Sequence, residues 1–137
     1  MQIRNIAFKA KRKDNGEWVE GSLIITEGSV AYIIRSKSKA FISKGKNIIC
    51  SAECYEINIE TLCQCTGLTD KNGKKIWEND IIELPGEDGY FVCEWQEDTT
   101  RFVLNGEGLT VDFDNYWSYE VEVIGNIFDN PDLLEVE

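Results

Sequence analysis

The chain has 137 residues, 42% of them hydrophobic and 11% aromatic, which is enough to build a packed core in one domain or in two small lobes. It contains no histidine, and this excludes Ser-His-Asp and Cys-His catalysis and removes the commonest metal ligand. Its net charge of −11 is unevenly divided, because residues 1–50 hold ten Lys or Arg and four Asp or Glu, a net charge of +6, whereas residues 51–137 hold four and 21, a net charge of −17.

No segment of the sequence is apolar enough to cross a membrane. The longest uninterrupted apolar run covers residues 30–34, against the ~20 residues that a spanning helix needs. Arg4, Lys9 and Lys11 interrupt the N-terminal apolar residues, so the apolar core of a secretion signal is missing. Five cysteines cannot all pair within one chain, and they fit a reducing compartment. We therefore expect a soluble, cytoplasmic protein.

In chain order, the patterns predict strands and turns in place of helices. Asp-Asn-Gly at 14–16 predicts a hairpin turn, because Asn and Gly accept a positive φ at low cost. Runs rich in β-branched and aromatic residues follow at 16–25 and 29–34. Apolar and polar residues alternate at 109–114 and 120–123, which indicates antiparallel strands with one buried face.

The clearest helical signal lies in the tail of the chain. Asn130 is a good N-cap, Pro131 suits the first helical position and Asp132 favours the first turn. We expect one short helical turn there, with Leu133 and Leu134 packed onto the core.

The stretch GLTDKNGKKIWENDII at 67–82 could be a ligand loop or a turn. Asn72-Gly73 between apolar residues is typical of a type I′ hairpin, in which both residues take a positive φ. A calcium loop needs glycine at its sixth position, whereas here glycine comes fourth and three lysines repel a cation. The sequence favours a turn that binds nothing, followed at 78–84 by a tight corner and a core strand.

Three blocks of the sequence resemble the YopX family, small proteins encoded by phages and prophages. QCTGLTDKNGKKIWENDII at 64–82 looks like the signature of the family, and residues 8–24 and 121–134 resemble its N-terminal and C-terminal blocks. The resemblance implies a phage origin and a mostly-β fold with a small barrel-like C-terminal part, and it implies no established activity. Two positions depart from the family: Asn79 replaces a usual glycine and Cys65 a usual aromatic residue. We expect a positive φ at Asn79 and a buried role for Cys65.

Together, the patterns and the resemblance predict an all-β fold of mostly antiparallel strands. We expect a basic N-terminal β lobe over residues 1–60 and an acidic, SH3-like or barrel-like lobe over residues 61–137.

The cysteines could form a four-thiolate zinc site. Cys50, Cys54, Cys63 and Cys65 are the candidate ligands, but a single residue between the last two is poor spacing for zinc. Cys63 and Cys65 share one strand face, as core residues do. We therefore expect these cysteines and Cys93 to be core residues, and we expect no metal and no cofactor.

Six carboxylates could in principle form a magnesium site or an acid–base pair. They are Asp80, Glu83, Asp112, Asp114, Glu120 and Glu122. Their alternation is also what the solvent-facing side of a strand produces, and the sequence favours that interpretation. No catalytic residues are predicted.

A row of basic residues is the best candidate for a binding surface. It consists of Arg35, Lys37, Lys39, Lys44 and Lys46. A positive stripe on a strand could contact phosphates. The favoured explanation is that the lysines protect an edge strand from aggregation or lie in a mobile loop. The four tryptophans could stack on bases, but each lies in an apolar pattern that favours core packing.

These observations predict a non-enzymatic module that binds proteins or assembles with its own copies into a homo-oligomer. The basic front and acidic back favour front-to-back contact between subunits. Alternatively, the basic lobe could fold over the acidic lobe of the same chain. The alternative is a nucleic-acid-binding protein that uses the basic N-terminal half. An enzyme ranks third, because the sequence supplies no catalytic constellation.

Overall fold

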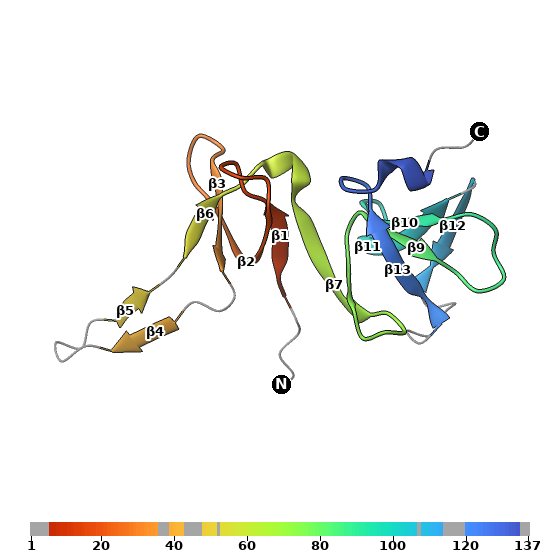
Figure 1. Cartoon of the computed structure of the whole chain (residues 1–137), viewed down its shortest axis with the longest axis horizontal. Helices are drawn as coiled ribbons and strands as arrows, with labels where there is room; N and C mark the ends of the chain where they lie inside the picture. Colours follow the sequence, from red (N-terminus) through yellow and green to blue (C-terminus); the bar gives the residue numbers. More distant parts are fainter. Residues whose placement is uncertain are drawn as a thin grey trace. The chain divides into compact units, whose positions relative to one another are not determined.

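A computed structural model describes residues 6–35, 39–42, 48–51, 53–106, 108–113 and 120–134. Within them the chain forms antiparallel strands joined by turns and short 3-10 turns, so the predicted all-β fold is confirmed (Figure 1). It divides into an N-terminal unit, Ala7–Gln64, and a C-terminal unit from Cys65 onward. Whether 1–60 and 61–137 are separate domains stays a prediction. None of the described helical segments is long and apolar enough to cross a membrane.

The N-terminal unit is a curled antiparallel sheet. Its strands are, in the order of the sheet, β6 (Cys54–Glu56), β3 (Ala31–Arg35), β2 (Trp18–Ile25), β1 (Phe8–Lys11) and the start of β7 (Cys63–Thr69). The N–H of Lys13 donates to the Glu56 carbonyl at 3.0 Å, and the N–H of Asn58 donates to the Lys11 carbonyl at 2.9 Å. These bonds bring the chain after β6 back to β1. The interior is narrow and holds small or β-branched residues: Ala10, Val19, Ala31, Ile33 and Ile57.

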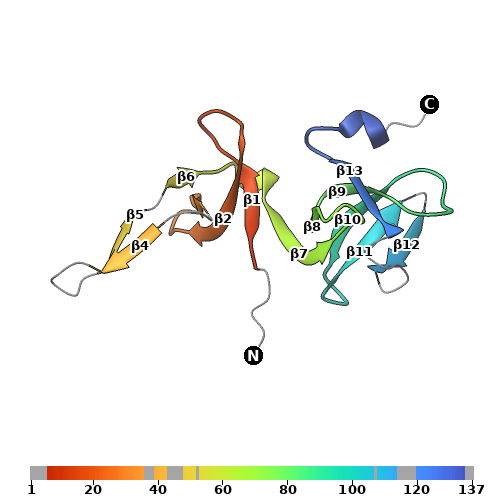
Figure 2. The ribbon, with the colours of Figure 1, turned by 60° about the horizontal axis from the view of Figure 1, so that its bottom comes forward.

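Two hairpins extend from this sheet. The predicted turn at 14–16 is confirmed, since it joins β1 to β2 and Gly16 has a φ of 73°. A longer hairpin begins with β3 and ends with β6. Between them, β4 (Lys39–Ile42) and β5 (Ile48–Ser51) pair as a separate two-stranded sheet (Figures 1 and 2).

The C-terminal unit begins where β7 pairs with β8 (Lys75–Trp77). A five-stranded sheet follows, in the order β12 (Leu109–Asp112), β11 (Arg101–Gly106), β10 (Phe91–Gln96), β9 (Asp80–Glu83) and β13 (Glu122–Asn126). The last strand therefore lies beside the first, as an SH3-like lobe requires. The sheet encloses a core of Ile76, Ile82, Leu84, Phe91, Cys93, Leu104, Val121 and Val123.

Two 3-10 turns complete the described structure around these sheets. η1 (Ile59–Thr61) precedes β7, and the Asn58 side chain caps its first turn. η4 (Pro131–Leu134) is the predicted C-terminal turn. The expected packing onto the core is wrong for Leu134, which is 37% exposed, whereas Leu133 is half-buried. A single turn presents only one side to the sheet.

Candidate functional site

The stretch at 67–82 forms a hairpin, but the predicted type I′ turn is wrong. Gly73 has a φ of 77°, whereas Asn72 is not in the left-handed region. The N–H of Gly73 donates to the Asp70 carbonyl at 3.0 Å, and the N–H of Asp70 donates to the Lys74 carbonyl at 2.8 Å. These bonds define a type I turn followed by a left-handed glycine, the common three-residue hairpin loop.

Asp70 explains the choice of turn. The residue is 4% exposed, and its Oδ1 accepts the N–H groups of Asn72 and Lys74, both at 2.9 Å. Oδ2 accepts the N–H of Val123 in β13 at 2.9 Å. Burial raises the pKa of Asp70, but the bonds from Val123, Lys74 and Asn72 outweigh it and hold that pKa below its ordinary value. The N–H of Lys71 also donates to the Val121 carbonyl at 2.9 Å, so the hairpin is fastened to the last strand.

The corner after β8 is built in the same way. Asn79 has a φ of 73°, which confirms the expectation from its replacement of glycine. Asp80 is 3% exposed, and its Oδ2 accepts the N–H of Trp77 at 2.8 Å. The main chain of Asn79 also donates to Cys93 and accepts from Ile127. These backbone bonds fasten the sharp bend to β10 and to the residue that follows β13.

Among the remaining candidate carboxylates that the structure describes, none is buried in the core of the C-terminal unit. Glu83 is exposed, Asp112 pairs with Arg101 at 2.9 Å and Glu122 with Lys71 at 3.5 Å. Glu120 is half-buried, and Asp114 lies outside the described residues. In the part of the chain that the structure describes, no group of three His, Cys, Asp or Glu side chains could hold a metal ion.

The cysteines fulfil the core prediction in part. Cys63, Cys65 and Cys93 are buried, which confirms the apolar role expected at Cys65, whereas Cys54 is exposed on β6 and the core prediction is wrong there. Cys54 lies on an edge strand of the sheet, and its side chain points away from the narrow interior. The side chain of Cys50 lies outside the described residues.

The tryptophans also divide. Trp77 is 5% exposed and belongs to the core, but Trp95 is 40% exposed, so core packing is wrong for it. Its ring meets Phe102 edge-on, and its Nε1 donates to Glu97 at 2.6 Å. Trp18 is half-buried, because its side chain lies on the face of β2 that points away from the interior. Trp117 lies outside the described residues.

The predicted basic row is described in part. Arg35 ends β3 with its side chain exposed, and the backbone of Lys39 begins β4. Lys37, Lys44 and Lys46 and the side chain of Lys39 lie outside the described residues. The structure therefore leaves the row as a prediction, apart from the contacts that Arg35 makes.

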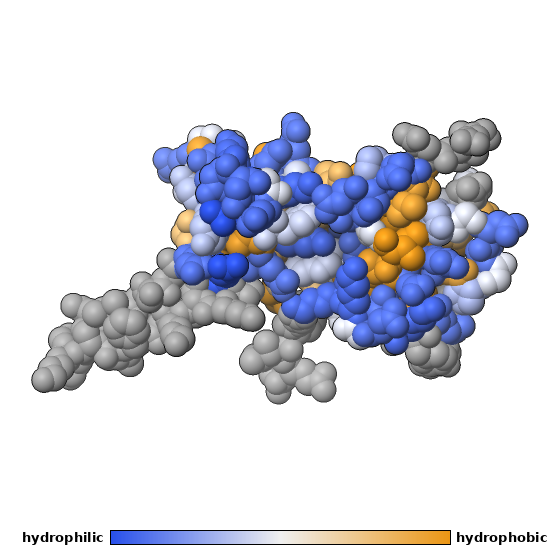
Figure 3. Space-filling view, viewed as in Figure 1, coloured by the Kyte–Doolittle hydropathy of each residue, from blue (hydrophilic) through white to orange (hydrophobic). Residues whose placement is uncertain are grey.

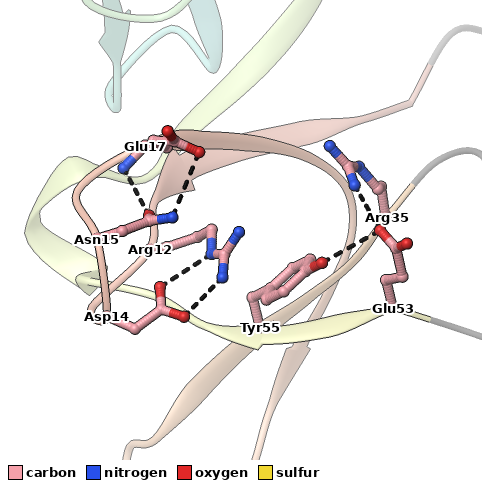
Figure 4. Close-up of polar contacts among 7 residues, drawn as sticks. All are labelled: Arg12, Asp14, Asn15, Glu17, Arg35, Glu53 and Tyr55. Atoms are coloured by element: carbon pink, nitrogen blue, oxygen red, sulfur yellow. Dashed lines mark hydrogen bonds and ion pairs between the residues drawn. The ribbon is translucent and has the colours of Figure 1, made fainter.

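Arg35 belongs to a group that the sequence did not predict, which we term the arginine–tyrosine cluster: Arg12, Asp14, Arg35, Glu53 and Tyr55 (Figure 4). The Arg12 guanidinium binds Asp14 through two bonds of 2.9 and 2.6 Å and lies 3.8 Å from the centre of the Tyr55 ring. The Tyr55 hydroxyl donates to Glu53 at 3.1 Å, and Arg35 pairs with the same carboxylate oxygen at 2.5 Å. One aromatic ring thus connects two arginine–carboxylate pairs.

Backbone pairing brings this cluster together. Tyr55 lies opposite Ile33 in the β3–β6 pair, and the N–H of Arg35 donates to the Glu53 carbonyl at 2.9 Å. Arg12 bridges to Ile57, the residue two positions after Tyr55. Because alternate residues share a strand face, Arg12 and Tyr55 meet on the same side. The contact spans 43 residues of sequence, so no local pattern could have revealed it.

The electrostatics of the cluster follow from these pairs. The bond from Arg12 lowers the pKa of Asp14, and the bonds from Arg35 and then Tyr55 lower the pKa of Glu53. Asn15 accepts the N–H of Glu17 at 2.9 Å and so fixes the turn that carries Asp14. The cluster offers two planar guanidinium groups at the surface, the geometry that binds carboxylates or phosphates.

Comparisons with known proteins agree with this architecture. The sequence profile of the YopX family, described as YopX protein, matches residues 7–135. The fold is similar to the crystal structure of protein EF1440 from Enterococcus faecalis, with a TM-score of 0.69 and 23% sequence identity over 97% of this chain and 100% of that one. At this identity the similarity shows the fold alone. No curated protein matches the chain.

Proposed function

The chain belongs to the YopX family, and on that premise we propose that it is a non-enzymatic, phage-type protein that binds proteins or assembles with its own copies. Charge is the observation that carries the proposal. Residues 7–64 hold nine Lys or Arg and seven Asp or Glu, a net charge of +2, whereas residues 65–137 hold four and 18, a net charge of −14. Opposite fields steer two molecules together and fix their orientation.

Such a charge division favours contact between unlike surfaces. A contact of this kind is heterologous and produces rings or filaments. Apolar side chains are available to stabilise it, including Ile25 at 61% exposure, Leu109 at 51% and Leu68 at 43%. Figure 3 also shows hydrophobic residues gathered within the hydrophilic surface of the C-terminal unit. We therefore propose a homo-oligomer that charge orients and apolar contacts hold.

The positions of the buried carboxylates support a non-enzymatic role. Asp70 accepts three backbone N–H groups and Asp80 accepts one, so both carboxylates hold turns. The thiols of Cys63 and Cys93 lie in the two units' interiors. Cys54, Cys63, Cys65 and Cys93 form no disulfide with one another, which fits the proposed cytoplasmic location.

Co-expression of a tagged and an untagged copy tests self-assembly. We expect the untagged copy to remain with the tagged one at low salt and to be released as salt rises, because screening weakens the orienting charges. Recovery of the tagged copy alone, together with no partner captured from prophage-bearing cells, would contradict the proposal.

One observation favours nucleic-acid binding as the second candidate. The Nζ atoms of Lys9 and Lys11 lie 4.7 and 5.4 Å from the centre of the Trp18 ring. Cations beside an aromatic ring are a combination that binds single strands. A gel shift with single-stranded DNA that disappears steeply with salt would support this candidate, and no shift at low salt would exclude it.

A further inference from the structure

We propose that the surface around Trp95 binds a basic segment of a partner protein, with an Arg or Lys side chain of that segment placed over the indole ring. The site consists of Trp95, Phe102, Glu97 and Asp98, at the end of the β10–β11 pair where the turn joins the two strands. The inference rests on the proposed binding of proteins, and it names the chemistry of the partner.

The indole ring of Trp95 is exposed and held in one orientation. It lies opposite Phe102, and the two rings meet edge-on with their centroids 5.1 Å apart and their planes at 70°. The ring Nε1 donates to Glu97 at 2.6 Å, and Phe102 packs against the core of the C-terminal unit. An edge-on contact covers at most one face of the indole, and the residue is 40% exposed. A face of the ring is therefore accessible to a ligand.

The charge beside this ring is negative, and no neighbouring cation balances it. Glu97 and Asp98 are exposed in the turn after β10, and neither carboxylate has an ion-pair partner among the described residues. Arg101, at the start of β11, is paired with Asp112 at 2.9 Å. A carboxylate and the face of an aromatic ring both attract a cation, so charge complementarity selects a basic ligand.

The N-terminal unit contains a similar arrangement with its cation in place. The Tyr55 hydroxyl donates to the Glu53 carboxylate, as the Trp95 Nε1 donates to Glu97. The Arg12 guanidinium lies 3.8 Å from the centre of the Tyr55 ring. No Lys or Arg side chain among the described residues occupies the corresponding position at Trp95. A partner would supply that cation.

Titration of the full-length protein with a tetraarginine peptide tests the site. At ~0.15 M salt, where screening reduces long-range attraction, Trp95→Leu should raise the Kd about threefold or more, and Glu97→Gln should do the same. Trp95→Phe keeps an aromatic face and should bind the peptide more tightly than Trp95→Leu. In the parent, the ring should also shift the NMR signals of the arginine methylene protons upfield, which long-range charge cannot do.

Glu87→Gln is the matched control. It removes one exposed carboxylate from a different turn of the same unit and should leave the Kd unchanged. Thermal melting checks that each variant is folded. Equal binding by the parent and Trp95→Leu, or no binding by the parent at about 1 mM peptide, would overturn the inference.

Light scattering of Trp95→Leu identifies the source of the basic segment. When this variant has lost the peptide, a mass below that of the parent shows that a second copy supplies the segment, and an equal mass shows that another protein does. A parent that assembles or captures a partner without binding the peptide would overturn this inference alone. A parent that does none of these would overturn the proposed function as well.

Discussion

Asp70 connects a local turn to a remote strand through one carboxylate. One oxygen accepts two N–H groups inside the turn, and the other accepts an N–H group 53 residues away. The local half follows from the sequence, because Asp before Asn-Gly favours such bonds. The bond to Val123 could not be predicted, since it depends on where the last strand lies.

Asp70→Asn should lower the free energy of unfolding by about 1–3 kcal/mol, because an amide cannot accept all three N–H groups. The pKa of Asp70 is lowered by folding, so its contribution is complete above its unfolded pKa of about 4 and is lost as pH falls through the lower folded value. Urea denaturation from about pH 6 to pH 2 should show the difference between parent and variant shrink with acid. The exposed Asp98→Asn is the control, and an equal effect of both substitutions would refute the role of Asp70.

Gly73→Val should destabilise the protein by about 1 kcal/mol or more. No atom lies within 4 Å of the added Cβ, so the cost comes from the φ of 77° and not from a clash. Gly73→Asn should cost less, because Asn tolerates this conformation better. Denaturation midpoints compare the two, and a valine variant as stable as the parent would show that the turn is assigned wrongly.

At the scale of elements, period-two patterns predicted the strands well, and Asp-Asn-Gly predicted the first hairpin. The core prediction failed for Trp95, because alternation assigns a residue to one face of a strand but does not show where the buried part of that face ends. The closure of the N-terminal sheet could not be predicted either, because it depends on hydrogen bonds from Lys13 and Asn58 to residues far away in the sequence. The arginine–tyrosine cluster depends on the same closure and was missed for the same reason.

Gly106→Ala tests the packing of β11 against the start of β10. A Cβ at Gly106 would lie 2.5 Å from the Tyr90 carbonyl oxygen and 3.1 Å from the Phe91 Cα, so the backbone must move. We expect a loss of about 1–3 kcal/mol in the free energy of unfolding. Asn105→Ala, one residue earlier on the same strand, should change it less. Unchanged stability of the glycine variant would contradict the close approach of these strands.

At the scale of the whole molecule, charge is the property that the sequence predicts best. The excess of basic residues in the first half concentrates between Glu27 and Glu53, where five Lys or Arg stand without any acidic residue. The acidic excess lies in the C-terminal unit. The partner of these charges is not encoded in any local pattern, because a second copy and another protein present the same chemistry.

Light scattering after gel filtration tests the central claim of self-assembly most directly. At ~0.15 M salt, where screening is moderate, and at tens of micromolar protein, we predict a molar mass that is a multiple of 15.6 kDa. Lys37→Glu with Lys39→Glu should lower that mass or slow its formation. A mass of 15.6 kDa for the parent under these conditions would contradict the account.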